Sequence, residues 1–90
     1  MSNKIAIASL AMDLKRVALA FYRGSEKSAN RFLEEALKRE GEIKKESVKP
    51  YLRKILEKLP DLTYEKDKKR VAEDALMYST IFQNYALHNL

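Results

Sequence analysis

The fold follows from residues 4–25, which read KIAIASLAMDLKRVALAFYRGS. Apolar side chains recur there at heptad spacing, which places them on one face of a helix; they are Ile7, Leu10, Leu14, Val17 and Phe21. Gly24 can adopt the left-handed conformation that stops a helix, and Ser25 is a suitable N-cap for the next one. The segment predicts a helix over residues 4–23, followed by a tight reversal of the chain.

Three more apolar patterns with helical period fill the rest of the chain, over residues 26–40, 48–59 and 64–87. The connections between them are short, and short connections make sequential helices antiparallel neighbours. The sequence therefore predicts an all-α protein, an up-down-up-down antiparallel four-helix bundle with residues 1–90 as a single domain.

The composition excludes several kinds of chemistry. The 90 residues contain no cysteine, one histidine, two glycines and two prolines. Disulfides, thiol nucleophiles and thiolate metal sites are therefore excluded, and Gly-rich phosphate loops are absent. Abundant Lys and Glu without Cys is typical of a hyperthermophile's protein, and a basic helical protein from a mesophile is the other explanation. The N-terminal apolar stretch faintly resembles a signal peptide, but Asp13, Lys15 and Arg16 interrupt it and the helical pattern continues past them. No segment is long and apolar enough to span a membrane, so we expect a cytoplasmic protein that makes no membrane contact.

The residues that common helical enzymes need are missing. A di-iron bundle requires Glu-x-x-His on two helices, but Tyr85 stands three residues before His88 and there is no second histidine. Nucleophile triads lack a positioned base for the same reason. The motif of helical nucleases combines an arginine with a histidine. The arginine that comes before His88, Arg70, is eighteen residues away in the sequence, so the motif has no candidate. We therefore expect a protein that is not an enzyme.

An oxygen-rich loop reads DLTYEKD over residues 61–67. Its oxygen-bearing side chains fall at alternate positions, the spacing used by loops that wrap Ca²⁺; they are Asp61, Thr63, Glu65 and Asp67. The loop departs from the EF-hand pattern at Lys66 and Ala72, where a glycine and a bidentate glutamate are expected. Glu26 would add an oxygen if the reversal at Gly24 lies at the same end of the bundle. This pattern predicts a weak Ca²⁺ site.

The same loop has a second explanation. Asp61 or Thr63 can cap the last helix, while Glu65 and Asp67 in its first turn complement the helix dipole. The lysines that follow the loop repel a cation. The sequence alone does not decide between these two explanations of the loop, a cation site and a capped start of the last helix.

A basic ridge lies between residues 44 and 58, where six bases and two acids give a local net charge of +4. The bases are Lys44, Lys45, Lys49, Arg53, Lys54 and Lys58. The ridge faces outward from the expected third helix, where it could bind the phosphates of a nucleic acid or an acidic protein. An ordinary solvated helix face is the other explanation.

The tyrosines are expected to serve packing. Tyr64, Tyr78 and Tyr85 share one face of the last helix, where packing at the bundle edge is favoured over a base-stacking platform. Tyr51 falls in the apolar stripe of the third helix, so we expect it in the core.

The first helix carries a second apolar stripe, interrupted only by Lys15; it comprises Ile5, Ala8, Met12 and Leu19. The last helix has no charged residue after Asp74. We expect that these two helices are the most enclosed elements of a monomer. The alternative is a homodimer or partner surface on the two helices.

Two segments, LAMDLKRVA over residues 10–18 and AEDALMYST over residues 72–80, carry a likeness to a known family. They resemble a small family of conserved hypothetical proteins from thermoacidophilic archaea of the Sulfolobus group, and the likeness covers essentially the whole chain. The resemblance implies a monomeric four-helix bundle and calcium binding. It supplies no ligand residues.

Overall fold

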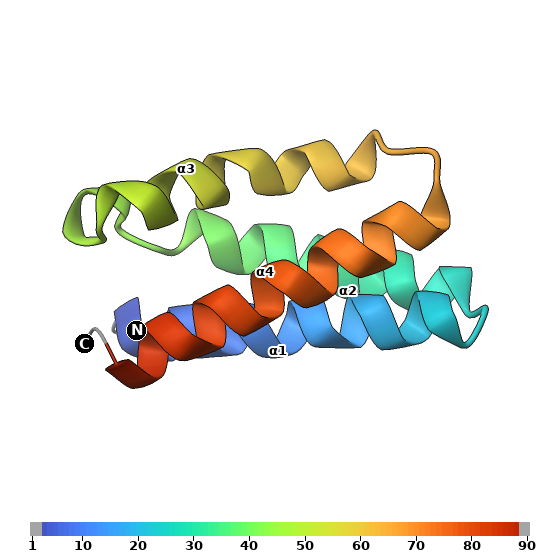
Figure 1. The fold of residues 1–90 in the computed structure, drawn as a ribbon, viewed down its shortest axis with the longest axis horizontal. Coiled ribbons are helices and arrows are strands. Elements are labelled where there is room, and N and C mark those ends of the chain that lie inside the picture. The colour runs from blue at the N-terminus through green and yellow to red at the C-terminus, as the bar shows by residue number, and fades with distance from the viewer. Residues whose placement is uncertain (1–2, 89–90) are drawn as a thin grey trace.

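The computed structural model describes residues 3–88, which form four helices that run alternately up and down the bundle (Figure 1). No strand occurs within these residues, so the predicted all-α four-helix fold is confirmed. The elements are α1 (Asn3–Tyr22), α2 (Glu26–Gly41), α3 (Pro50–Lys58) and α4 (Lys68–His88), with short 3₁₀ helices η1 (Lys45–Ser47) and η2 (Leu59–Thr63) on either side of α3.

The chain reverses between α1 and α2 as the sequence predicts. Gly24 has a φ of 78°, in the left-handed region that glycine adopts without steric cost. Its N–H donates to the carbonyl of Phe21 at 3.0 Å, and the N–H of Ser25 donates to the carbonyl of Ala20 at 2.8 Å. The Ser25 side chain accepts no capping hydrogen bond from any described residue, so the glycine and these backbone bonds make the turn.

The third helix is shorter than the predicted range of residues 48–59. It begins at Pro50, because a proline disfavours helical geometry in the residue before it. Lys49 is accordingly extended, with a ψ of 149°. The helix ends at Lys58, where the chain tightens into η2.

The predicted start of the last helix, residue 64, is wrong. Residues 59–63 form the 3₁₀ helix η2, and α4 begins only at Lys68. Tyr64 therefore lies in the connection and not on the inner face of a helix, and it is 81 % exposed.

Helix α1 is the central element, since it packs closely against both α4 and α2. Small buried side chains allow this close approach; they include Ala6, Ala11, Ala18, Ala29, Ala36, Ala72, Ala75 and Ser79. The hydroxyl of Ser79 on α4 donates to the carbonyl oxygen of Ala11 on α1 at 2.8 Å, in a buried position. This bond fixes the contact between the first and last helices.

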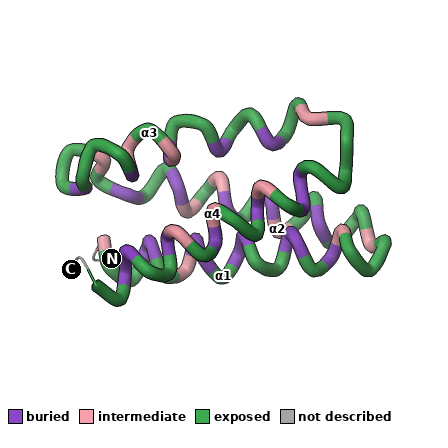
Figure 2. Tube along the Cα trace, viewed as in Figure 1, coloured by how far each residue is buried: buried purple, intermediate pink, exposed green. Residues whose placement is uncertain are grey.

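Helix α3 is held differently. Its close main-chain neighbours are chiefly the flanking turns η1 and η2, and Figure 1 shows it apart from the α1–α4 pair. Leu52 and Leu56 fill the space below it and are fully buried. Figure 2 shows that α3 is buried along its inner side and exposed along its outer side.

The second apolar stripe of α1 faces outward. Ile5, Met12 and Leu19 are 55 %, 52 % and 43 % exposed. The expectation that this stripe is enclosed is therefore wrong. On α4, Leu76 and Leu87 are also exposed, so both helices present apolar side chains at the surface.

Candidate functional site

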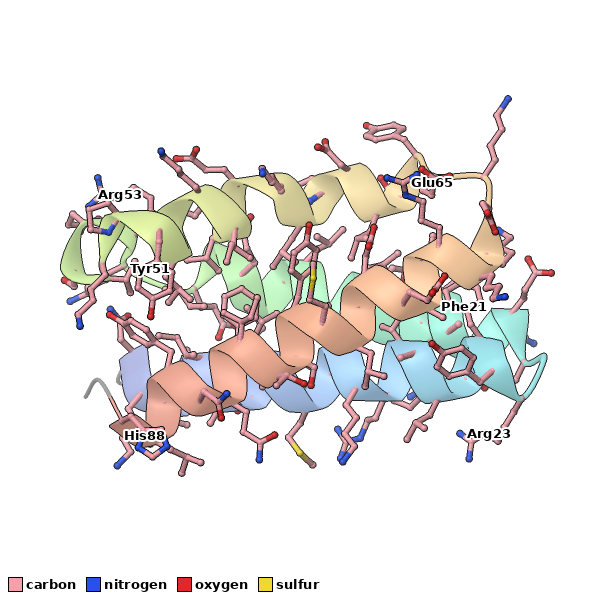
Figure 3. All side chains as sticks on the ribbon, in the orientation of Figure 1. Phe21, Arg23, Tyr51, Arg53, Glu65 and His88 are labelled. Atoms are coloured by element: carbon pink, nitrogen blue, oxygen red, sulfur yellow. The ribbon has the colours of Figure 1, made fainter. Side chains whose placement is uncertain are left out.

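The oxygen-rich loop lies at the same end of the bundle as the reversal between α1 and α2. Figure 3 shows Glu65 beyond the end of α3 and Phe21 of α1 beneath it. Glu26 reaches this end as expected, but its carboxylate Oε1 lies 3.3 Å from the Nζ of Lys68 and forms an ion pair with it.

The loop oxygens do not converge on one point. Because residues 59–63 are a 3₁₀ helix, alternate side chains do not line one side as they do in an extended loop. The Thr63 hydroxyl donates to the carbonyl of Pro60 at 2.7 Å. The Glu65 carboxylate accepts the Asp67 N–H at 3.2 Å. These oxygens serve local turns.

A cleft of about 280 Å³ lies beside the loop, lined by Glu34, Glu65 and Lys68 among others. The Lys68 Nζ, which pairs with Glu26, also lies 5.8 Å from the ring centroid of Phe21, so the charge of the Glu26 carboxylate is balanced by an ammonium group. Among residues 3–88 no three His, Cys, Asp or Glu side chains are grouped to hold a metal ion. Calcium binding by this loop therefore stays a prediction. The described residues do not supply a set of ligands for the ion.

The residue that caps α4 is Asp67. Its Oδ1 accepts two backbone N–H groups of the first turn, from Lys69 at 3.1 Å and from Arg70 at 3.4 Å. The expected caps, Asp61 and Thr63, are too far back in the chain, because the helix starts five residues after Thr63. The loop therefore caps the last helix, as its second explanation proposed, but the capping residue is Asp67 and not Asp61 or Thr63.

Asp67→Ala is expected to lower the free energy of unfolding by about 1 kcal/mol, because it leaves two N–H groups of α4 without their acceptor. Urea denaturation measures the change. Asp61→Ala removes the same group from an exposed position and is the matched control. Equal losses in the two variants would contradict the assignment of the cap.

The charge of the chain is concentrated in residues 44–70, which we call the basic edge. These residues hold ten bases and five acids, whereas the rest of the chain holds eight of each, so the edge accounts for the whole net charge of +5. In Figure 1 the edge runs along one side of the molecule, from one end of the bundle to the other. The long axis of the bundle extends 35 Å.

One end of the basic edge is firmly held. The Nζ of Lys45 lies 3.0 Å from the carboxylate of Glu40, which is buried. The Nε of Arg53 donates to the carbonyl of Lys45 at 3.1 Å, and the N–H of Lys49 donates to the hydroxyl of Tyr85 at 3.2 Å. These bonds tie η1 to the start of α3 and to α4.

Along the middle of the edge the bases face water. Lys54 and Lys58 are exposed and form no ion pair with any described residue. The prediction that Tyr51 lies in the core is wrong, since it is 49 % exposed; its ring lies edge-on to that of Tyr85 at a centroid distance of 6.1 Å. Tyr64 adds a second exposed ring farther along. The edge therefore combines unpaired lysines with accessible aromatic faces.

Sequence reasoning missed a buried acid between α1 and α2. Asp13 is only 8 % exposed, and its Oδ1 lies 3.5 Å from the Nη1 of Arg16. Its Oδ2 has no hydrogen-bond partner among the described residues. Burial raises the pKa of the Asp13 carboxyl above its ordinary value, although the charges of Arg39 and Arg16 oppose the rise. An aspartate at a position between two apolar heptad residues is the signal that could have identified it.

The raised pKa of Asp13 predicts how the free energy of unfolding depends on pH. A carboxyl whose pKa is higher in the folded than in the unfolded state favours folding when it is protonated, and this contribution is lost as the pH rises through the folded-state pKa. The free energy of unfolding of the wild type, relative to Asp13→Asn, should fall as the pH rises from 3.8 through the raised value and then stay constant.

Chemical denaturation at a series of pH values measures this difference. Glu73→Gln removes a carboxylate from an exposed position of α4 and supplies the baseline. A free energy of unfolding of the wild type that rises with pH relative to that of Asp13→Asn would contradict the prediction.

Comparison with protein-family models, curated proteins and solved structures finds no match to this chain, so the likeness to an archaeal family stays a prediction. No helix in the described part of the chain combines the length and apolarity needed to span a membrane.

Proposed function

We propose that the protein is a small binding module for single-stranded nucleic acid, and that the basic edge is its binding surface. The observation that carries the proposal is the concentration of the entire net charge of +5 in residues 44–70, which form one side of the bundle. The remaining surface is neutral overall, so a polyanion is drawn to this side.

The shape of the edge suits a phosphate backbone. Lys54 and Lys58 lie one helical turn apart on the exposed side of α3. Further bases lie before this helix and after it, so positive charge is distributed along the 35 Å axis of the molecule. Contacts of this kind are independent of base sequence and weaken as salt rises.

The exposed tyrosines favour a nucleic acid over an acidic protein. Proteins that bind single strands combine a basic track with aromatic side chains on which the bases stack. Tyr51 and Tyr64 are 49 % and 81 % exposed, and both belong to the basic edge. The bases of a duplex are already stacked, so these rings favour a single strand.

The lysines are tested by the salt dependence of binding. Fluorescence anisotropy of labelled single strands of about 20 nucleotides gives the affinity as salt rises from about 50 to 200 mM. Lys54→Gln/Lys58→Gln is expected to reduce the slope of log K against log salt by about 1.4, since each phosphate contact to a single strand contributes about 0.7. Lys27→Gln/Arg31→Gln makes the same charge change at exposed positions of α2 and should leave that slope unchanged.

The stacking part of the proposal is tested separately. Tyr64→Ala is expected to weaken the binding of a single strand about tenfold, because one stacked base contributes about 1–3 kcal/mol. The salt slope should not change, since no charge is removed. Tyr22→Ala removes an exposed ring of α1, outside residues 44–70, and is the control.

The proposal fails if the wild type does not bind single strands at the lowest salt. It also fails if the control variants weaken binding as much as the edge variants do. Tighter binding to a duplex, or to an acidic polypeptide of equal charge, would show that the tyrosines do not select the ligand.

A further inference from the structure

The cleft beside the oxygen-rich loop, which we call the loop cleft, is not used by the proposed function. Its volume of about 280 Å³ is close to the lower end of the range of roughly 300–1,000 Å³ that is typical of small-ligand pockets. Much of its lining is apolar and buried or partly buried, and four elements contribute to it. The apolar lining residues are Phe21 of α1, Leu33 and Leu37 of α2, Leu62 of η2 and Val71 of α4. Such a lining can hold a flat ring.

Two polar side chains of the lining have hydrogen-bonding groups that the fold does not use. Asn30 and Glu34 lie one turn apart on α2, and both are exposed. Neither side chain forms a hydrogen bond or an ion pair with any described residue. The Glu34 carboxylate only accepts hydrogen bonds, whereas the Asn30 amide both donates and accepts them. The loop cleft therefore offers a carboxylate and an amide to a ligand that both donates and accepts.

The loop cleft lies at one end of the basic edge. Thr63, Glu65 and Lys68 belong to the edge and also line the cleft. Tyr64, which is 81 % exposed, stands between the first two of them in the chain. Figure 3 shows Glu65 at this end of the bundle, with Phe21 beneath it. A strand that stacks one base on Tyr64 thus passes the cleft, and a neighbouring base is within reach of it.

We infer that the loop cleft takes up one base of the bound strand and selects a base with an exocyclic amino group, which means adenine, cytosine or guanine over uracil and thymine. The inference rests on the proposed function, because it adds base selection to a surface whose lysines contact only phosphates. Glu34 accepts the amino N–H of the base, and the Asn30 amide pairs with a neighbouring ring atom. Uracil presents a carbonyl oxygen at this position, and an oxygen that faces a carboxylate makes no hydrogen bond.

The charges of the loop cleft favour a base over a phosphate. Its lining contains two carboxylates, Glu34 and Glu65, and one ammonium group, Lys68, which already pairs with Glu26. A phosphate is therefore repelled from the interior, although the basic edge attracts it outside. The Glu65 carboxylate accepts the Asp67 N–H at 3.2 Å, so Glu34 is the carboxylate that has no partner. A neutral ring with N–H donors is the part of a strand that matches this lining.

The first test uses nucleosides, which carry no phosphate and so do not depend on the basic edge. Deoxycytidine and deoxyuridine have nearly the same shape but carry an amino group and a carbonyl, respectively, at the position that Glu34 would contact. In an NMR titration, deoxycytidine should shift the backbone amides of Asn30, Leu33, Glu34 and Val71. Deoxyuridine should bind about fivefold more weakly, which is the low end of the discrimination provided by a direct base contact.

The second test uses strands and a matched pair of variants. Fluorescence anisotropy compares labelled oligo-dC and oligo-dU of about 20 nucleotides at neutral pH and fixed salt. The wild type should prefer oligo-dC about fivefold, and Glu34→Ala should bind the two strands equally. Glu35→Ala removes the same charge from the next residue of α2, which is exposed and is not among the lining residues, and should keep the preference. A general electrostatic gain affects both variants alike, so only the ratio of the two affinities reports on the cleft.

The inference and the proposed function can fail separately. Equal affinity of the wild type for the two strands, or a preference that survives Glu34→Ala, would overturn the inference even if the salt dependence of the basic edge is as expected. Deoxycytidine shifts at the cleft without binding of any strand would overturn the proposed function and support the base site. Shifts caused by butylammonium but by neither nucleoside would show that the cleft is a cation site, and this result would also overturn the inference.

Discussion

Phe82→Ala is expected to lower the free energy of unfolding by about 4 kcal/mol. Phe82 is fully buried, with an exposure of 0 %, and it belongs to the core formed by all four helices. Truncation removes most of the ring and leaves a cavity that rigid helices close only in part. A domain of this size is stabilised by about 5–13 kcal/mol in total, so a large share of its stability is lost.

Thermal and urea denaturation measure this effect. Met77→Ala, five residues earlier on the exposed side of α4, should change the stability by no more than about 0.5 kcal/mol. A loss below about 2 kcal/mol for Phe82→Ala would mean that the core repacks around the missing ring.

Ser79→Leu is expected to destabilise the protein by about 3 kcal/mol. The hydroxyl of Ser79 is 2.8 Å from the carbonyl oxygen of Ala11, so α1 and α4 approach closely at this point. A leucine removes the hydrogen bond and forces the helices apart or into strained rotamers, which costs about 1–3 kcal/mol in a packed interior. Loss of the bond adds about 1 kcal/mol.

Two variants separate these contributions. Ser79→Ala loses only the hydrogen bond, so its cost should be about 1 kcal/mol. Thr80→Leu introduces the same side chain at the neighbouring exposed position and should be nearly neutral. If Ser79→Leu were as stable as Thr80→Leu, the close approach of the two helices at Ala11 would be wrong.

The helical architecture could be predicted from the sequence because its determinants are local. The heptad from Ile7 to Phe21 and the glycine at position 24 define α1 and its end without reference to other elements. The start of α4 could not be predicted in this way. Pro60 and Asp61 favour a turn but do not specify where the next helix begins, and in the structure Leu59 and Leu62 of η2 are buried against the core.

The candidate sites were harder to predict, because each depends on how elements face one another. Alternate oxygens at residues 61–67 would converge only in an extended loop, and η2 makes the first of them helical. The local charge of the basic ridge could be counted in the sequence, but the exposure of Tyr51 could not be predicted, because this residue falls in the apolar stripe of α3. The first helix carries two similar apolar stripes, so the sequence could not show that the stripe containing Met12 is the one that faces the solvent.

The manner in which α3 is held has a consequence for its motion. The helix has nine residues, too few to be stable alone, and it rests on leucine side chains without the close backbone contacts that join α1 to α4. Amide hydrogens of α3 should therefore exchange with solvent by local opening well before those of α1. Part of the most charged surface of the protein thus lies on a helix that opens more readily than α1, so a ligand bound there would slow the exchange of these amides.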